Sequence, residues 1–311
     1  MAYEYQVTNK RYHTLDYYLK TKYGKKVFKL PLNASFSCPN RDGTKGIGGC
    51  TFCSNKGSGD FAGNPLHSLT QQYEEMIRVM KRKWPDAYYI VYFQAYTNTY
   101  GSIQKLKETF EPFIGKENVI GMSIATRPDC INEEIVDYLK DLKQHFSEFW
   151  IELGLQTSYD KTAKIIHRCY PYSCFEKAVQ LLHKAQIPVV VHIIDGLPHE
   201  TPKMMVQTIK KLNKLPIFGI KIHMLNILEG TKIAKDYANQ KFTLLSEQEF
   251  IDVVIEQLQH LKGSIIVHRI GGDSDALQLI APKWIIKKLN VVNQIDKKME
   301  ELGVFQGDLF V

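Results

Sequence analysis

The hydrophobic pattern of the chain alternates between short apolar runs and amphipathic stretches. Seven apolar, β-branched runs predict strands at residues 28–34, 88–95, 119–125, 149–155, 189–194, 219–225 and 264–270. The runs YYIVYF and VVVHII are almost continuously apolar, which is typical of parallel strands buried on both faces. Helical periodicity between the runs predicts helices that include residues 69–83, 132–145, 174–185 and 202–214.

The spacing of these elements predicts an α/β fold. After a long first gap, the strands follow one another at about thirty to forty-five residues, the size of a strand–helix repeat. Such repeats form either a TIM-type barrel or an open doubly wound sheet. No Gly-rich turn of the GxGxxG type follows the first strand, which disfavours a dinucleotide-binding sheet.

Polar clusters at the ends of four predicted strands favour the barrel. They lie at residues 94–98, 126–129, 156–158 and 192–195. In a barrel these clusters converge on the carboxyl face, where such enzymes place their chemistry. We therefore predict a partial or complete TIM-type (β/α) barrel over residues 28–245, after a basic aromatic segment (1–27) and before a strand–helix extension (246–311).

Composition narrows the class of protein. The chain has 311 residues, of which 44% are hydrophobic and 23% charged, and this balance argues against a disordered chain. No apolar run approaches the roughly 18 residues that a membrane-spanning helix needs. The N-terminal sequence lacks the apolar core of a signal peptide. These features predict a cytoplasmic protein without a membrane partner.

The net charge of +7 is concentrated near the N-terminus. Residues 10–29 contain seven bases and one acid, Asp16, with tyrosines interleaved. A surface of this kind can pair with phosphates and stack on bases, so Lys22, Lys25 and Lys26 are candidate contacts to a nucleic acid. The alternative is a solvated helix whose aromatic side chains dock inward.

Three of the six cysteines lie close together in the sequence, at positions 38, 50 and 53. A Cys-x-x-Cys pair and a third cysteine on a Gly-rich loop can form a three-thiolate set. Three thiolates with an open position suit a [4Fe-4S] cluster, whereas a structural zinc site is normally closed by four ligands. A zinc site with a distant fourth ligand and a buried structural trio are the alternatives. Cys130, Cys169 and Cys174 fit better as small buried residues.

The segment KLPLNASFSCPNRDGTKGIGGCTFC resembles the cluster-binding segment of radical S-adenosylmethionine (SAM) enzymes, specifically the YtqA/YhcC family. That family is related to the radical SAM domain of the Elongator catalytic subunit. The likeness continues through SIATRPDC, ELGLQT, HRCYPY, DGLPHET and HRIGGD. The usual pattern of the superfamily is Cys-x3-Cys-x2-Cys, and here the first gap is eleven residues, as in this branch.

The resemblance implies two cofactors, a [4Fe-4S] cluster and SAM. It makes Cys38, Cys50 and Cys53 the cluster ligands and places Phe52 near the adenine of SAM. The Gly-Gly-Glu that binds the methionyl amine in relatives is absent. Gln94 and its neighbours stand in that place, without a carboxylate.

Four more residues become candidates for binding SAM through the resemblance. Relatives often carry a ribose-binding Glu where this chain has Ala125 followed by Thr126 and Arg127. Gln156 matches a SAM-contacting Gln, and Arg168 matches an Arg that pairs with the SAM carboxylate. His192 stands where relatives have a ribose-binding Asp, although a buried, satisfied histidine is the alternative.

The resemblance also implies a function. It is the conversion of 5-carboxymethylaminomethyl(-2-thio)uridine to 5-aminomethyl(-2-thio)uridine at the wobble position of tRNA, through a 5′-deoxyadenosyl radical. The implied partners are tRNA, a flavodoxin- or ferredoxin-type reductant and a tRNA methyltransferase acting afterwards. One alternative is radical chemistry on a small molecule or porphyrin. A zinc-stapled RNA-binding module is the other, and seven strand–helix units are excessive for it.

Overall fold

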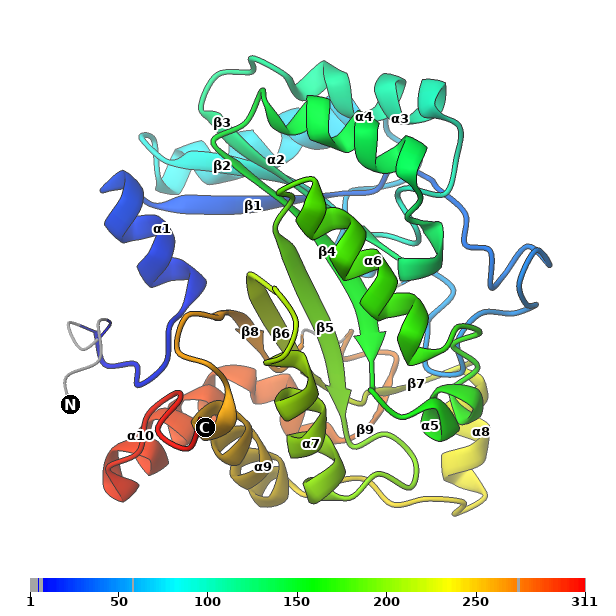
Figure 1. Ribbon diagram of the computed structural model, residues 1–311, viewed down its shortest axis with the longest axis vertical. Helices are drawn as coiled ribbons and strands as arrows, with labels where there is room; N and C mark the ends of the chain where they lie inside the picture. Colours follow the sequence, from blue (N-terminus) through cyan, green and yellow to red (C-terminus); the bar gives the residue numbers. More distant parts are fainter. Residues whose placement is uncertain (1–4, 6–7, 58, 273–274, 311) are drawn as a thin grey trace.

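The main structural element is a curled, seven-stranded parallel sheet (Figure 1). The computed structural model describes residues 5, 8–57, 59–272 and 275–310. In spatial order the strands are β1 (Val27–Leu32), β2 (Tyr88–Phe93), β3 (Val119–Thr126), β4 (Glu148–Gln156), β5 (Val189–Asp195), β6 (Gly219–Met224) and β8 (Ile266–Ile270). Since β1 and β8 are the two edges, the barrel is open, and the predicted partial TIM-type fold is confirmed.

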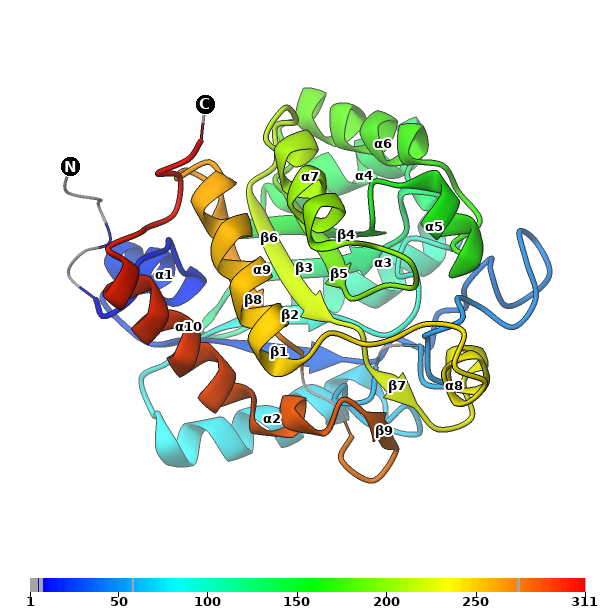
Figure 2. The same cartoon turned by 90° about the horizontal axis from the view of Figure 1, so that it is seen from below.

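Helices cover the outer face of the sheet (Figures 1 and 2). The longer ones are α2 (Leu69–Lys83), α3 (Ile103–Phe110), α4 (Glu133–Lys143), α6 (Tyr172–Lys184), α7 (Pro202–Leu212), α9 (Glu247–His260) and α10 (Lys288–Leu302). In α4, Ile135, Leu139 and Leu142 recur at helical spacing and are buried, which explains why this helix packs on the strands. Ser68 and Ser246 begin α2 and α9 with capping boxes.

Several short elements complete the chain. Helices α5 (Asp160–Ile165) and α8 (Lys232–Ala238) and the 3-10 helices Glu111–Phe113, Pro128–Cys130 and Lys283–Lys287 lie in the connections. Strands β7 (Ile227–Leu228) and β9 (Leu279–Ala281) form a small antiparallel pair. Within the described ranges, no helix is long and apolar enough to cross a bilayer.

Helix α1 (Leu15–Tyr23) covers the amino ends of the strands. Its buried Leu19 packs in a cluster with Ile90, Trp150 and Val190, and Thr14 forms a bridge to β8. The basic aromatic segment therefore contains the helix with inward-docking side chains that the sequence left as an alternative. The candidate lysines Lys22, Lys25 and Lys26 lie at this end of the barrel, because they immediately precede β1.

The C-terminal residues close the same end of the molecule and contribute to the main sheet. Strand β8 pairs with β6, so the predicted extension over residues 246–311 contributes the last strand of the sheet. The side chain of Gln306 accepts a hydrogen bond from the His13 amide (2.8 Å) and donates to the Ile265 carbonyl (2.8 Å). Lys10 pairs with Asp296 of α10. The N- and C-terminal segments therefore lie side by side (Figure 1).

Candidate active site

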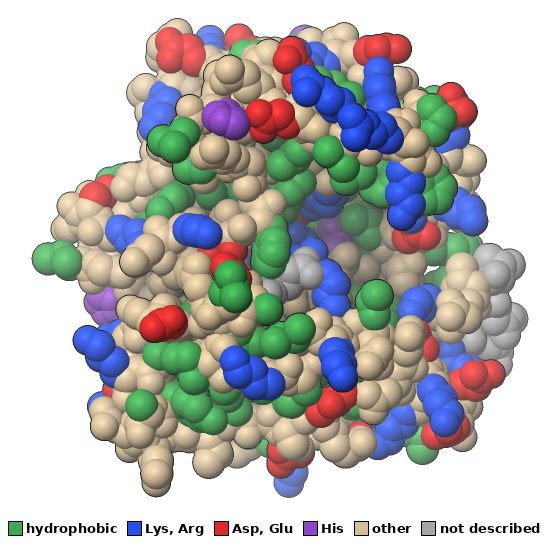
Figure 3. All heavy atoms as spheres, turned by 180° about the vertical axis from the view of Figure 1, so that it is seen from behind, with side chains coloured by type: hydrophobic (Ala, Val, Ile, Leu, Met, Phe, Trp, Pro, Cys, Tyr) green, Lys and Arg blue, Asp and Glu red, His purple; other side chains and the backbone are tan. Residues whose placement is uncertain are grey.

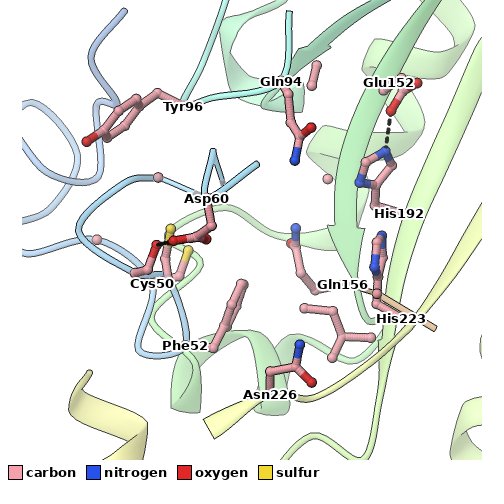
Figure 4. A pocket seen from close by; sticks show the side chains of 18 of the residues that line it. Cys50, Phe52, Asp60, Gln94, Tyr96, Glu152, Gln156, His192, His223 and Asn226 are labelled. Atoms are coloured by element: carbon pink, nitrogen blue, oxygen red, sulfur yellow. Dashed lines mark hydrogen bonds and ion pairs between the residues drawn. The ribbon is translucent and has the colours of Figure 1, made fainter. Parts of the chain in front are cut away.

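One cavity of about 280 Å³ lies at the carboxyl ends of the strands, near the lower end of the roughly 300–1,000 Å³ typical of small-molecule sites. The loop after β1 forms one wall, and residues of β2 to β6 and β8, or just after them, form the rest. Figure 4 shows side chains from both walls pointing into it. This is the face on which the polar clusters were predicted to converge.

The cysteine loop brings its three thiols to the cavity. Cys38, Cys50 and Cys53 all line it, although Cys38 is distant from the other two in sequence. The Cys38 carbonyl accepts hydrogen bonds from the amides of Arg41 (2.8 Å) and Asp42 (3.2 Å). Gly48 and Gly49 have φ of 84° and 86°, a backbone conformation that favours glycine. These turns let the loop fold back so that the three cysteines face one space.

The surroundings of the cysteines fit an iron–sulfur cluster. Burial raises the pKa of the Cys50 thiol to about 12, and the neighbouring Cys53 adds to this, so a bound metal would have to displace the proton. In the described part of the chain, no three His, Cys, Asp or Glu side chains converge on a position for a single metal ion. A cluster does not require such convergence, because each thiolate binds a different iron.

The other three cysteines do not line the cavity. Burial raises the pKa of the Cys130 thiol to about 12. The Cys169 thiol donates to the carbonyl of His167 (3.6 Å), and Cys174 lies in the first turn of α6. Their partly buried positions agree with a packing role.

Five of the six predicted SAM-binding residues meet in this cavity: Phe52, Gln94, Arg127, Gln156 and His192. Gln156 ends β4 with φ of 64°, which turns the chain sharply at the cavity wall. Its Oε1 accepts a hydrogen bond from the Tyr170 hydroxyl (3.2 Å). Arg127 is oriented by a two-fold contact with Asp129 (2.9 and 2.8 Å) and lies over the Tyr170 ring.

Arg168 is the sixth, and the structure places it outside the cavity. It is fully buried, and its five N–H groups are matched by five hydrogen bonds. The acceptors are the carbonyls of Leu155, Thr157 and Tyr170 and the carboxylate of Asp160. This guanidinium holds the end of β4 in place, and the geometry leaves no N–H for the SAM carboxylate expected from the resemblance.

Glu152 is the centre of a polar network inside the barrel. It forms ion pairs with Lys29 and Lys221 and a hydrogen bond with His192 (2.7 Å), rather than pairing with Arg127 or Arg168. Burial alone would raise the pKa of Glu152, but Lys221 and Lys29 hold it well below its usual range. Burial, reinforced by Lys221, lowers the pKa of His192 to about 4. His192 is therefore a neutral, partnered histidine whose ring still lines the cavity.

Several cavity residues were not singled out from the sequence. Asp60 lines the wall near the cysteines and accepts hydrogen bonds from the Ser54 hydroxyl (3.1 and 3.2 Å). Lys221 and His223 of β6 and Arg269 of β8 line the opposite part. Lys221 and His223 are two residues apart in an otherwise apolar strand, so they face the same side. That alternation was a signal for a polar barrel interior.

Comparison with known proteins identifies the family. The Radical SAM superfamily model matches residues 38–212, and the Radical_SAM C-terminal domain model matches residues 217–301. Protein YtqA of Bacillus subtilis (strain 168) is 45% identical over 306 residues, which cover 98% of this chain and 95% of that protein.

Two further relatives share part of the fold. The tRNA uridine(34) acetyltransferase of Methanocaldococcus infernus is 27% identical over 205 residues, 65% of this chain and 36% of that protein. The solved structure of Elp3 from the same archaeon has a TM-score of 0.69 at 17% identity, covering 91% of this chain and 64% of that one. The chain belongs to the radical SAM superfamily and, within it, to the YtqA/YhcC family, whose cofactors are a [4Fe-4S] cluster and SAM.

Proposed function

We propose that this radical SAM enzyme modifies the wobble uridine of tRNA, removing the carboxymethyl group from a 5-carboxymethylaminomethyl side chain to leave 5-aminomethyl. The observation that carries the tRNA substrate is the relation to the tRNA uridine(34) acetyltransferases, which covers 65% of this chain. The matched part of the chain has the length of a barrel, not of a whole acetyltransferase, since it covers only 36% of that relative. The partial match is what we expect of two enzymes that act on the same class of substrate and catalyse different final reactions.

The cavity residues suit the cofactors of the family. Cys38, Cys50 and Cys53 would hold the cluster, and the aromatic ring of Phe52 would pack near the adenine. Asp60 provides a carboxylate for the methionyl amine in the absence of the Gly-Gly-Glu motif, and Arg127 provides a guanidinium for a carboxylate. When bound, the cluster and SAM supply a 5′-deoxyadenosyl radical that abstracts a hydrogen atom from the substrate.

The barrel contributes a polar, partly enclosed space beyond the cysteines. Radical chemistry needs such enclosure, because water and solvent-borne donors would quench a reactive intermediate. A methylene beside nitrogen gives up a hydrogen atom readily, because the nitrogen stabilises the radical. Loss of one further electron and addition of water would then break the C–N bond, so that the two carbons leave as glyoxylate and the amine remains. SAM, which is reduced to methionine and 5′-deoxyadenosine, would be the oxidant overall. The proposal retains a cytoplasmic location, a flavodoxin- or ferredoxin-type reductant and a methyltransferase that uses the free amine.

Mass spectrometry of tRNA nucleosides tests the proposal. Cells lacking the gene should accumulate 5-carboxymethylaminomethyluridines and lose the 5-aminomethyl form and its methylated product. The wild-type gene should restore the pattern and a gene encoding Cys53→Ala should not, whereas one encoding Cys174→Ala should. An unchanged nucleoside profile in the deleted strain would refute the tRNA substrate and leave a small-molecule or porphyrin substrate as the next hypothesis.

A further inference from the structure

The cavity contains a group of basic side chains on the side away from the cysteines. Figure 4 shows Glu152, His192 and His223 across the cavity from Cys50, with Gln94 and Gln156 between them. Lys221 lines this side, and the strand register places it directly beside His192 of β5 and Arg269 of β8. Neighbours in register on parallel strands face the same side of the sheet. Three adjacent strands therefore present a row of basic side chains to one region.

The two lysines of this region are not matched one for one by carboxylates of the described residues. Lys29 and Lys221 share the single carboxylate of Glu152, one on each oxygen. The remaining hydrogen bonds of these amines go to neutral hydroxyls, Ser123 for Lys29 (3.3 Å) and Tyr92 for Lys221 (3.1 Å). With both amines charged, the pair would carry one positive charge in excess, and a buried cation without a counter-ion is costly.

Two further observations indicate that a ligand belongs here. The Nε2 atom of His223 is buried and has no hydrogen-bond partner among the residues that the structure describes. Burial lowers the pKa of Lys221 to about 7, and nearby Lys29 and Arg269 contribute to this. An anion in contact with Lys221 would stabilise its charged form. In Figure 3, Lys or Arg side chains and a His side chain are visible in a hollow on the face opposite to that seen in Figure 1.

We propose that Lys221, His223 and Arg269 form a carboxylate-binding site that receives the carboxymethyl group of the substrate. The site rests on the proposed function for the identity of that substrate. Cys38, Cys50 and Cys53 would hold the cluster and Asp60 would hold the methionyl amine, so the methionyl end of SAM would lie at the cysteine wall. A carboxylate held across the cavity would place the methylene next to it in the space between, where the hydrogen atom must be taken. Lys221 and Arg269 therefore select a side chain that ends in a carboxylate, and the unpartnered Nε2 of His223 adds a hydrogen-bonding group.

A pair of nucleosides tests the site by binding. The protein, loaded with cluster and SAM but without reductant, is titrated with 5-carboxymethylaminomethyluridine and with its neutral carboxamide. Wild type should bind the acid roughly tenfold or more tightly than the amide, the value of one charged hydrogen bond. Lys221→Met and Arg269→Gln should bring this ratio towards one, and Lys221→Arg should restore much of it. Lys140→Met, an exposed lysine on α4, is the matched control.

The ratio separates a binding role from a structural one. A variant that merely folds less well would lose affinity for acid and amide alike, and its iron content and SAM affinity report on folding independently. Equal binding of the two nucleosides by wild type, or an unchanged ratio in Lys221→Met and Arg269→Gln, would overturn the site.

A third result of the titration would bear on the proposed function and not on the carboxylate site. If wild type binds neither nucleoside, the uridine substrate fails, and the site is then decided with N-methylglycine, which carries the same amine and carboxylate. Broadening of its ¹³C-carboxylate resonance by wild type, but not by Lys221→Met, would retain the site for another carboxylate substrate. If wild type instead broadens only the ³¹P resonance of inorganic phosphate, the site binds a phosphate and the carboxylate assignment is overturned.

Discussion

The three cavity-lining cysteines have a role that the other three cannot replace. Replacing Cys38, Cys50 or Cys53 by Ala should abolish cluster binding and SAM cleavage, because each thiolate holds a separate iron. Cys174→Ala should leave both intact, since this thiol lies outside the cavity. Iron and sulfide content after anaerobic reconstitution, together with visible absorption, measure the effect. A brown, active Cys38→Ala protein would refute the ligand assignment.

Asp60 is the residue that we propose for the contact with the SAM amine. Asp60→Asn should keep the cluster but weaken SAM binding by roughly tenfold or more, because a neutral amide cannot pair with an ammonium. Anaerobic titration of the cluster-loaded protein with SAM measures this. Unchanged affinity would assign the amine contact to another cavity residue.

Arg168 should behave in the opposite way. Arg168→Ala removes five hydrogen bonds and leaves buried carbonyls without donors, so we expect a loss of stability of at least about 3 kcal/mol. Denaturant unfolding measures it, and the SAM affinity of whatever fraction folds should fall less than in Asp60→Asn. A stable Arg168→Ala protein that fails to bind SAM would restore the expectation from the resemblance.

At the scale of elements, Asp195 joins the end of β5 to α9 and makes that contact sensitive to pH. Its Oδ1 accepts a hydrogen bond from Gln257 of α9 (2.9 Å), while its Oδ2 is buried without a partner among the described residues. Burial raises the pKa of Asp195 from 3.8 to about 7, and Glu200 adds to the shift. The folded state therefore keeps a proton that the unfolded chain has already released.

The direction in which stability changes with pH follows from this difference in pKa between the folded and unfolded chain. The contribution of Asp195 to stability is fully present below pH 3.8 and is lost as the pH rises to about 7. Asp195→Asn cannot ionise, so its free energy of unfolding should improve relative to wild type between pH 5 and about pH 7 and then stay level. Urea unfolding at several pH values measures the difference. Parallel pH profiles for the two proteins would contradict the prediction.

The lysines in and just after helix α1 have two different roles. Lys22 pairs with the buried Glu148 (2.6 Å), whereas Lys26 pairs with the exposed Asp16 and Lys25 lies over the Tyr88 ring. Lys22→Gln should therefore cost about 1 kcal/mol of stability, since Glu148 keeps hydrogen bonds from tyrosine hydroxyls. Changing Lys25 and Lys26 to Gln should leave stability nearly unchanged.

The same variants test the predicted tRNA contact. If Lys25 and Lys26 neutralise tRNA phosphates, removing either charge should lower the log–log salt slope of tRNA binding by up to about 0.9. SAM cleavage without tRNA should survive, because α1 lies at the end of the barrel opposite the cysteine loop. An unchanged slope would move the tRNA surface elsewhere, first to Lys283, Lys287 and Lys288 in the C-terminal segment.

At the scale of the whole molecule, the barrel could be predicted because its strands are buried on both faces. All seven predicted strands overlap the observed ones, since an apolar run such as VVVHII has few other stable environments. Strands β7 and β9 were missed because two or three residues carry no periodicity. Helix α1 was left open because it buries little beyond Leu19, and its position depends on the barrel end beneath it.

The site was predictable only where spacing determined it. The cysteines were found because chelation restricts their separation, and the strand-end residues because parallel strands align their carboxyl ends. Arg168 could not be assigned, since nothing in the sequence shows which carbonyls will surround a guanidinium. Lys221 was missed for a related reason, because its role depends on contacts with Glu152 and on the nearby Lys29, which are distant from it in the sequence.

If the substrate is tRNA, as proposed, the position of the cavity determines what the polynucleotide must do to be modified. The cavity lies between the cysteine loop and the carboxyl ends of the strands, and a base stacked within a duplex would not reach its interior. A nucleotide must rotate out of its stack, at a cost of a few kcal/mol that is smallest where the base is already unpaired. A base in a loop leaves its stack at a lower free-energy cost than a base in a helix. The enzyme would therefore discriminate among uridines first by how easily each one unstacks, and only then by the chemical groups that it carries.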